Sequence, residues 1–397
     1  MTDVAMLAVA NNPDLKLARD DAGVASAQAF SAGLLPDPQI NLSRDFPVAS
    51  GLVSAFNGGL AFDISSLISL SARRSAGHAD QRKADLALLW QEWQAVAQAR
   101  KLFVDVIYTD SIAQLQRRSL ALAEQRVQAA RQALQAGNAT LDALTPYLVA
   151  QEDARRQLDD QNRLRLQARY ALNAFLGLAP DVHLDLAAPS AYPELDAESI
   201  RQALRDLPKR RPDLLALSAG YQAQEARLRA AVLAQFPSLN IGFTRARDTS
   251  ANYTRGFTAS ISLPIFNRNR GNIAIETATR TRLRDEYQNR VNAAYATVAQ
   301  ILDDQKLIDT QMRAATDAVA TLTQTIEAAD AAYRAHNLTL TAYVDLQSAL
   351  RTKRADLLAL QRTSLQQRIA LQSLLGGDVP QSGPLSTAST APEQELK

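Results

Sequence analysis

The stretch YQNRVNAAYATVAQILDDQKLIDTQMRAATDAVATLTQTIEAADAAY, residues 287–333, decides the fold. One series of residues runs through it in steps that alternate between four and three, and every member except Gln305 is apolar or aromatic. A seven-residue apolar repeat of this kind keeps one seam of a helix facing its partners, because slight underwinding holds the seam in place. The members of this seam are Tyr287, Val291, Ala294, Val298, Ile301, Gln305, Ile308, Met312, Ala315, Val319, Leu322, Ile326, Ala329 and Tyr333.

The helix that carries this seam is unusually long. No Pro or Gly interrupts the chain from Asn272 to Asn337. At 1.5 Å per residue, a helix of about 65 residues is about 100 Å long, several times the diameter of an ordinary domain. The sequence therefore predicts a long helical rod.

Composition excludes several classes of protein. The 43 basic residues nearly balance the 41 acidic ones, which argues against a nucleic-acid-binding scaffold. The chain has no cysteine, so disulfides, thiolate metal sites and a cysteine nucleophile are excluded. No apolar run reaches the roughly 18 residues of a membrane-spanning helix. Ala, Leu, Gln and Arg are frequent, and all four favour helix.

Motifs for catalysis and for metal binding are absent from the sequence. We find no phosphate-binding glycine loop, no GxSxG and no HExxH, so we expect neither an enzyme nor a bound cofactor. The few His and Met side chains have no spacing that suits a soft metal, and we expect no metal site. These residues are His78, His183, His336, Met1, Met6 and Met312.

The chain contains a long internal repeat. Pro13-Asp14-Leu15 recurs as Pro212-Asp213-Leu214, at an offset of 212 − 13 = 199 residues. Three further landmarks share this offset, which indicates duplication of a whole half-protein rather than a solenoid. The pairs are Pro38 and Pro237, Asn138-x-Thr140-Leu141 and Asn337-x-Thr339-Leu340, and Leu176-Gly177 and Leu375-Gly376.

Each repeat reads as a helix, a proline stop, short extended segments, a very long helix, a tight turn and a returning helix. Proline ends the first helix of each repeat because it removes a hydrogen-bond donor and restricts the residue before it. The predicted parts are a first repeat at 1–177 (strands 38–46 and 56–65, helical hairpin 71–177), a linker or equatorial segment at 178–208, a second repeat at 209–376 (strands 237–247 and 253–265, helical hairpin 270–376) and a disordered tail at 377–397.

Apolar and polar residues alternate in the extended segments. Leu239, Ile241 and Phe243 alternate with small polar residues, and Phe257 and Ile261 lie in a second such segment. A period of two predicts strands with one apolar and one polar face. An exposed hairpin packed on the helices is one interpretation. Apolar-out, polar-in strands with aromatic residues near their ends are also typical of an outer-membrane β-barrel. Four strands cannot close a barrel, so that interpretation requires several chains.

The combination resembles the TolC-like outer-membrane efflux family over nearly the whole chain. Asn11-Asn12-Pro13-Asp14-Leu15 and the run at 33–38 are similar to the branch that serves heavy-metal and related RND-type pumps. Leu263-Pro264-Ile265-Phe266 is similar to the family's passage from strand to helix. The run at 338–347 resembles its second helical-tip motif, and the run at 137–144 its first. Each motif is weak alone, but their order and duplication are specific.

The resemblance implies a mainly α protein with a small β part, in which an internally duplicated protomer contributes long helices to an α-barrel. It further implies a homotrimer whose three chains give four strands each to a twelve-stranded barrel in the Gram-negative outer membrane, with the helical part in the periplasm. The implied function is a passive exit duct of a tripartite efflux system. The implied partners are a periplasmic adaptor, an inner-membrane RND-type pump reached through it, and outer-membrane lipid.

The two predicted turns carry the candidate site. Hairpin chemistry alone explains them, because Gly137 suits a left-handed helix end and Thr140 and Thr339 suit helix N-caps. The resemblance adds the hypothesis that these periplasmic tips dock the adaptor and form the closing aperture. The candidate tip residues are Gly137, Asn138, Thr140, Leu141, Asp142, Asn337, Thr339, Leu340 and Tyr343.

Two acidic residues just past the turns allow two interpretations. Asp142 and Asp345 would select cations or bind a plugging ion if they lined a narrow pore. Equally, each is a solvated charge that is favourable near a helix N-terminus. The rival to the duct as a whole is a soluble coiled-coil scaffold protein, and the matched period-two segments in both halves count against it.

Overall fold

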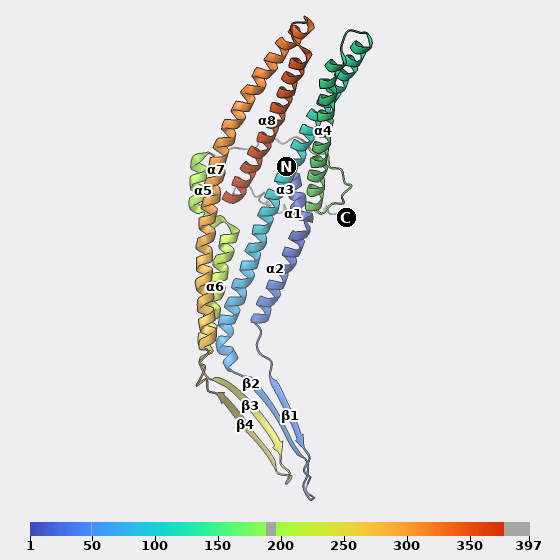
Figure 1. Cartoon of the computed structure of the whole chain (residues 1–397). Coiled ribbons are helices and arrows are strands. Elements are labelled where there is room, and N and C mark those ends of the chain that lie inside the picture. Colours follow the sequence, from blue (N-terminus) through green and yellow to red (C-terminus); the bar gives the residue numbers. More distant parts are fainter. Residues whose placement is uncertain (49, 188–195, 377–397) are drawn as a thin grey trace, which may run out of the picture. The chain divides into compact units, whose positions relative to one another are not determined.

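The computed structural model describes residues 1–48, 50–187 and 196–376. Its elements recur in the same order in the two halves of the chain, and the two halves contribute two strands each to one four-stranded sheet (Figure 1). The predicted fold class, mainly helical with four strands and an internal duplication, is confirmed. The predicted tail at 377–397 lies outside the described residues. The first half contains α1 (Thr2–Asn11), α2 (Pro13–Ala32), β1 (Gln39–Asp45), β2 (Ala55–Asp63), α3 (Ser65–Gln135) and α4 (Leu141–Phe175).

The second half begins with a helix that the sequence did not indicate. Helix α5 lies largely inside the segment 178–208, which was predicted as a linker or equatorial segment, although residues 188–195 of that segment are not described. With α5 as the counterpart of α1, the elements of the second half match those of the first one for one. They are α5 (Ala197–Arg210), α6 (Pro212–Leu233), β3 (Ser238–Arg247), β4 (Tyr253–Ser262), α7 (Arg270–Arg334) and α8 (Leu340–Leu375).

The chain divides into two compact units, and each draws on both halves of the sequence. One unit comprises 1–13, 92–207 and 296–397, and the other comprises 14–91 and 208–295. The long helices α3 and α7 each contribute residues to both units. The compact units therefore do not coincide with the sequence repeats.

The seam of α7 is buried or half-buried along its whole predicted length. None of its members is exposed, and Val298 is completely buried. The heptad pattern at 287–333 thus identified the side of α7 that packs within the protomer. Leu307, which lies off the seam, is exposed.

A cluster of apolar side chains from α1, α3, α4 and α8 forms the core of the first unit. Small residues let these helices approach closely, and one large aromatic ring, Phe103, fills the space between them. Asn12 joins α1 to this cluster, because its side-chain amide donates a hydrogen bond of 2.7 Å to the carbonyl of Phe175 at the end of α4. The cluster consists of Val4, Ala8, Ala99, Phe103, Val104, Val106, Leu172, Leu176 and Ile369.

The matching position in the second half uses an ion pair instead. Arg211, offset by 199 from Asn12, is the N-cap of α6, and Pro212 fills the first helical position, where its missing N–H costs nothing. The Arg211 guanidinium donates two hydrogen bonds, of 2.8 and 2.7 Å, to the Asp213 carboxylate, and it lies 4.7 Å from the centre of the Trp90 ring. Both charged side chains are buried, at 5% and 7% exposure.

The sheet has a simple antiparallel topology. Its order is β1-β2-β3-β4, and β2 pairs with β3 across the two halves of the chain, with Leu60 opposite Phe243. Strands β1 and β4 are therefore its two edges. Both hairpin turns lie at the end of the sheet away from the helices of the second unit (Figure 1).

The passages from strand to helix differ between the halves. After β2 the helix begins almost at once, because the Asp63 carboxylate accepts a 2.9 Å hydrogen bond from the backbone N–H of Ser65 and so caps α3. After β4 the chain makes a longer turn in which Arg268 and Asn269 have left-handed φ values of 46° and 52°. Pro264 accounts for the difference, since the first half has Ser65 at that position.

The buried ion pair gives a stability prediction. In Asp213→Ala, the Arg211 guanidinium would remain buried without its partner, and we expect the free energy of unfolding to fall by roughly 3–5 kcal/mol. Urea unfolding of the detergent-solubilised protein, followed by circular dichroism, measures the change.

The matched control is Asp303→Ala. Asp303 pairs with Lys306 at 2.9 Å, but both side chains are 77% exposed, so we expect no measurable shift. Equal shifts in the two variants would show that burial of the Arg211–Asp213 pair has no special role.

Candidate functional site

The two helical turns have the same backbone. Helix α3 ends in a Schellman motif, in which the N–H of Asn138 bonds to the carbonyl of Ala133 at 2.8 Å and the N–H of Gly137 bonds to Leu134 at 3.1 Å. At the end of α7, the N–H of Asn337 bonds to Ala332 at 2.8 Å and that of His336 to Tyr333 at 3.0 Å. The residues that donate and accept these hydrogen bonds in the second turn each lie 199 positions after their counterparts in the first.

The residue in the left-handed position differs between the turns. Gly137 has φ of +71°, as predicted, whereas His336 has φ of +60° at the equivalent position. Side chains with a Cβ disfavour this conformation, so the second turn carries strain that the first does not. The sequence comparison of the two halves contained this signal, because His336 lies 199 residues after Gly137.

The N-caps after the turns also differ. Thr339 is the N-cap of α8, and its hydroxyl accepts a hydrogen bond of 3.4 Å from the N–H of Ala342. Thr140 occupies the N-cap of α4 with an extended backbone, but its side chain makes no capping hydrogen bond. Leu141 is 68% exposed, and the Leu340 side chain is not among those described.

The structure places the two predicted acidic residues differently. Asp345 lies on α8 and lines a cavity of about 400 Å³, together with residues of α3 and α4. Asp142 is exposed in the first turn of α4 and does not line this cavity. The two residues are not equivalent in the repeat either. The position 199 residues after Asp142 is Thr341, and the position 199 residues before Asp345 is Pro146.

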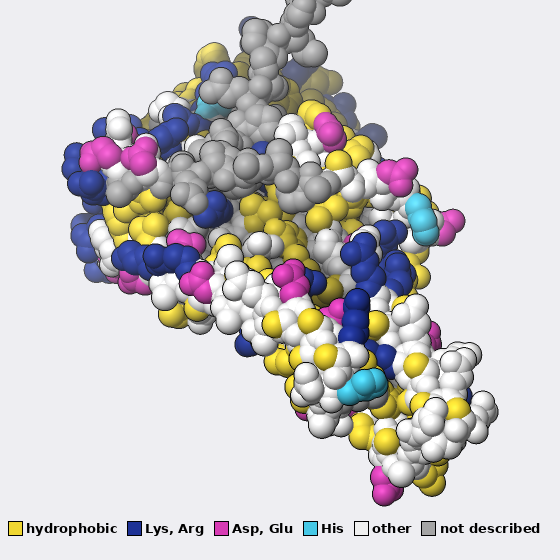
Figure 2. Space-filling view, turned by 90° about the horizontal axis from the view of Figure 1, so that it is seen from above, with side chains coloured by type: hydrophobic (Ala, Val, Ile, Leu, Met, Phe, Trp, Pro, Cys, Tyr) yellow, Lys and Arg dark blue, Asp and Glu magenta, His cyan; other side chains and the backbone are white. Residues whose placement is uncertain are grey.

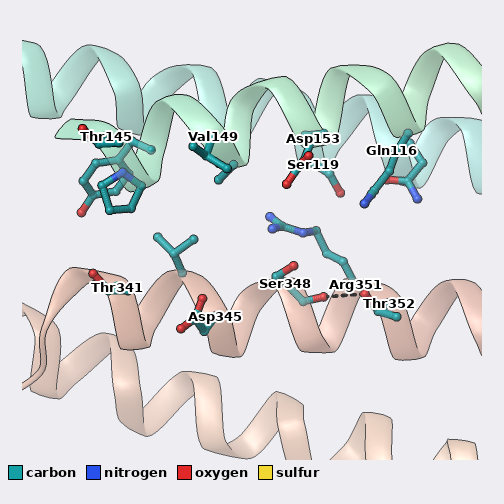
Figure 3. A pocket seen from close by; sticks show the side chains of 16 residues that line it. Gln116, Ser119, Thr145, Val149, Asp153, Thr341, Asp345, Ser348, Arg351 and Thr352 are labelled. Atoms are coloured by element: carbon teal, nitrogen blue, oxygen red, sulfur yellow. Dashed lines mark hydrogen bonds between the residues drawn. The ribbon is translucent and has the colours of Figure 1, made fainter. Parts of the chain in front are cut away.

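Polar side chains surround the cavity (Figure 3). Arg351 extends from α8 toward Ser119 of α3 and Asp153 of α4. Its Nη1 is buried and has no hydrogen-bond partner among the described residues. Burial, and then the charge of Arg126, lower the pKa of Arg351.

Tyr147 is the most buried polar side chain of this cavity's α4 wall. It is 5% exposed, and its hydroxyl has no hydrogen-bond partner in the described chain. Burial raises the pKa of Tyr147 to about 12, so the hydroxyl stays protonated at any physiological pH. The cavity gathers hydroxyls, two carboxylates and one guanidinium, and no histidine is among the described residues that line it.

One polar network between the two hairpins escaped the sequence analysis. The Arg126 guanidinium of α3 lies 5.2 Å from the centre of the Tyr343 ring and also donates a hydrogen bond to Gln347. Tyr343 stacks on Tyr333 with ring centroids 5.1 Å apart and donates a 2.9 Å hydrogen bond to Asp330. Among the candidate tip residues, Tyr343 of the α7–α8 hairpin is the one that contacts the α3–α4 hairpin in this network, through Arg126.

A second contact between the hairpins lies farther from the turns. Asp105 of α3 accepts a 2.8 Å hydrogen bond from Gln366 of α8, and Arg362 lies 3.6 Å from it. Burial raises the pKa of Asp105 against the opposing effect of Arg362. Buried polar contacts of this kind contribute little net stability.

Charges of both signs are interspersed on the visible face in Figure 2, and no single sign dominates it. Within residues 1–48, 50–187 and 196–376, no group of three or more His, Asp or Glu side chains has an arrangement that would hold a metal ion. The same residues contain no helix that is both long enough and apolar enough to cross a membrane.

Comparison with known proteins finds similarity to outer membrane efflux proteins. The family model described as outer membrane efflux protein matches residues 203–377. The cobalt-zinc-cadmium resistance protein CzcC of Cupriavidus metallidurans is 25% identical over 376 residues, which are 93% of this chain and 85% of CzcC. Over residues 203–377, which are less than half of its length, the chain is similar to outer membrane efflux proteins. It is an outer-membrane protein, and its helical part lies in the periplasm.

Solved structures of this efflux family share the fold over almost the whole chain. The outer-membrane channel CmeC of Campylobacter jejuni matches with a TM-score of 0.83 and 15% identity, over 95% of this chain and 85% of CmeC. A crystal structure of CusC matches with a TM-score of 0.80 and 21% identity, over 95% of this chain and 92% of CusC. These relatives are named as channels and resistance proteins rather than enzymes.

The two turns give a matched pair of predictions. Gly137→Ala adds a Cβ at a left-handed φ, and we expect it to destabilise the α3–α4 turn by about 1 kcal/mol. His336→Gly removes the same strain from the α7–α8 turn, and we expect a gain of about 0.5 kcal/mol after the entropy cost of glycine. Hydrogen exchange of peptides that cover each turn measures both effects. Shifts of the same sign in the two variants would contradict the left-handed geometry at one of the turns.

Proposed function

We propose that three copies of this chain form the exit duct of a tripartite efflux system. The duct conducts substrate passively from a periplasmic adaptor and an inner-membrane pump to the exterior. The single observation that carries the proposal is a four-stranded sheet with two open edges and one apolar face. The adaptor and the pump are proposed from the family resemblance. The several copies are proposed because the sheet has two unpaired edges.

The edges of the sheet require partners. On the outer side of β1 and of β4, the backbone N–H and C=O groups have no strand to pair with among the described residues of one protomer. Hydrocarbon provides no hydrogen bonds, so an open edge is not tolerated within a membrane. Pairing β1 of one copy with β4 of the next removes every edge once the ring closes. Three copies give twelve strands, an even number as in other bacterial barrels.

The faces of the sheet suit this arrangement. The strand residues that alternate toward one side are large and apolar, and Phe257 is 89% exposed in the protomer. Those on the other side are small and polar, among them Asn41, Asn240 and Ser260. The apolar face would meet lipid and the polar face would line a water-filled lumen.

The tips are proposed to dock the adaptor. Leu141 is an exposed apolar side chain at a turn, and large apolar side chains are scarce in the polar surroundings of that turn. The name of CzcC, cobalt-zinc-cadmium resistance protein, favours a metal-ion pump of the RND type as the partner at the inner membrane. The duct then carries the ions without chelating them.

A soluble coiled-coil scaffold remains the rival function. It would explain the long helices and the seam of α7. It gives no reason for a row of exposed Phe, Ile and Leu side chains along one face of a sheet, because such a face would aggregate in water.

Disulfide crosslinking tests the trimer, and the absence of native cysteine makes any crosslink unambiguous. Asn41→Cys on β1 is combined in turn with Thr258→Cys, Ser260→Cys or Ser262→Cys on β4. We expect one of the three pairs to give a covalent trimer on non-reducing gels, because only neighbouring edges come close enough for a disulfide.

The control for this crosslink is Asn57→Cys with Ser260→Cys. These positions lie on β2 and β4, which are not neighbours either within a protomer or across the proposed joint. If all three edge pairs stayed monomeric under oxidation, or if the control crosslinked equally well, the ring of three copies would have to be abandoned.

A charge at the tips tests adaptor docking. We expect Leu141→Asp combined with Leu340→Asp to abolish crosslinking to the adaptor while leaving trimer formation unchanged, since a carboxylate opposes burial of an apolar contact. The control is Lys306→Asp, which introduces the same acid at an exposed site on α7. Unchanged adaptor crosslinking in the double variant would defeat the docking proposal.

A further inference from the structure

The four strands carry their positive charges in one place. All four basic residues of the described strands are arginines, and they lie in the rows next to the hairpin turns. Arg44 and Arg247 both stand opposite Phe56, and Arg245 stands opposite Arg255. Residues that face one another in an antiparallel register project to the same side of the sheet. The four arginines therefore share one face.

That face is the apolar one. Strand alternation places the arginines on the same side as a band of large apolar residues, whereas the two strand carboxylates, Asp45 and Asp63, lie on the opposite side. A water-filled lumen would be the usual place for charge in a barrel. Here all of the positive charge of the strands faces the other way. The apolar band comprises Ile40, Leu42, Leu60, Phe62, Leu239, Ile241, Phe243, Phe257 and Ile261.

Arg245 and Arg255 form a pair of like charges. They are direct cross-strand partners, both are exposed, and the described chain offers neither a hydrogen bond nor an ion pair. Like charges directly opposite one another destabilise a sheet. An anion bound between the two guanidiniums would turn this repulsion into attraction.

The other two arginines are held in place. Arg247 donates a 2.7 Å hydrogen bond from Nη2 to the carbonyl of Ser54, and the Ser54 hydroxyl accepts a 3.2 Å hydrogen bond from Arg44. Arg44 lies 5.1 Å from the centre of the Phe46 ring, and Arg247 lies 5.9 Å from that of Tyr253. The two guanidiniums thus converge on one serine among aromatic rings, the arrangement typical of a membrane interface.

The nearest carboxylate in the β3–β4 turn is already engaged. Asp248 accepts hydrogen bonds from the backbone N–H groups of Ser250 and Asn252 at 2.8 and 2.9 Å. These bonds build the turn itself. Asp248 is therefore not the partner of Arg245 or Arg255.

The position along the strands fits an interface. A ten-residue strand is about 34 Å long, and at a tilt of about 40° it rises about 26 Å, close to the height of the apolar band of an outer-membrane barrel. An arginine facing lipid is costly at mid-depth and nearly free of cost at the interface. Rows next to the turns lie at the interface, and the turns point away from the helices (Figure 1). With the helices in the periplasm, that interface is the outer leaflet.

We propose that Arg44, Arg245, Arg247 and Arg255 form an arginine belt that binds the phosphate groups of an anionic lipid in the outer leaflet, whose acyl chains lie along the apolar band below. The inference rests on the proposed trimeric barrel, in which three copies of the belt encircle the duct. Arginine suits the role because its planar fork binds phosphate through two parallel hydrogen bonds. In a Gram-negative outer membrane, lipopolysaccharide supplies such phosphates.

Lipid binding to the purified, detergent-solubilised protein tests the belt. The probes are bisphosphorylated lipid A and the same lipid without phosphate, and native mass spectrometry counts bound lipids per protein. We expect the wild type to prefer the phosphorylated lipid, and Arg245→Gln with Arg255→Gln to bind it at least about tenfold more weakly, as the loss of charge-assisted hydrogen bonds implies.

Two further variants keep the test sharp. Arg245→Lys with Arg255→Lys retains the charges, and it should keep most of the preference for phosphate. Arg156→Gln with Arg163→Gln removes two exposed arginines from α4, at 72% and 74% exposure, and it should bind like the wild type. If this control lost as much lipid A binding as the Arg245→Gln, Arg255→Gln variant, the loss would be due to net charge alone and the belt would be wrong.

The remaining outcomes separate the two proposals. If the trimer mass is present but both lipids bind equally, or the glutamine variant binds lipid A normally, the belt is wrong and the duct stands. If millimolar inorganic phosphate displaces lipid A completely, the arginines bind a soluble anion and the lipid is not the occupant. If the protein is monomeric in the same spectra, the duct fails, and the belt fails with it.

Discussion

The backbone hydrogen bonds at the two edges of a four-stranded sheet constrain everything else in this protein. A sheet whose apolar face suits lipid cannot leave β1 and β4 unpaired there, because nothing in hydrocarbon replaces the missing partners. A soluble protein can cover an edge with a helix or a charged loop, but a membrane protein has to close the ring. One chain supplies too few strands to close such a ring, and for this reason we propose that several copies assemble. The long helix α3 begins directly after β2 at Ser65, and α7 begins after a short turn at Arg270.

Duplication explains why the two halves of the chain have the same order of helices and strands. The differences between the halves show where side chains can vary. The backbone of the two helical turns is the same, although Gly137 fills the left-handed position in one and His336 in the other. The caps of α2 and α6 illustrate the same freedom. Asn12 holds the first junction with one amide hydrogen bond, whereas the second uses the buried Arg211–Asp213 pair. The backbone geometry is common to both halves, but different side-chain interactions stabilise it in each half.

Local patterns made much of the fold predictable. The seam at 287–333, the proline stops and the alternation in the strands each depend on residues close in the chain, and each appears in the structure where the pattern indicated. The left-handed conformation of Gly137 was predictable for the same reason. Helix α5 was missed because three prolines nearby suggested a linker, while the helix itself begins only after them.

The long-range side-chain contacts were not predictable. Arg126 and Gln347 are 221 positions apart, and no repeat or spacing relates them, so only the packing of α3 against α8 brings them together. Likewise, Asp142 and Asp345 both lie just past a turn in the sequence, yet only Asp345 lines the cavity. The arginine belt is an intermediate case. Counting alternation outward from Phe243 and Phe257 places Arg245 and Arg255 on the apolar face, but their direct opposition needed the strand register.

The mass of the particle that leaves a lipid bilayer tests the central claim most directly. The protein, expressed in an outer membrane and extracted with its surrounding lipid in nanodiscs, is released into native mass spectrometry and weighed. A closed ring of three predicts a protein mass about three times that of the 43.2 kDa chain. A particle of one chain mass, still inserted in lipid and with β1 and β4 unpaired, would contradict the account.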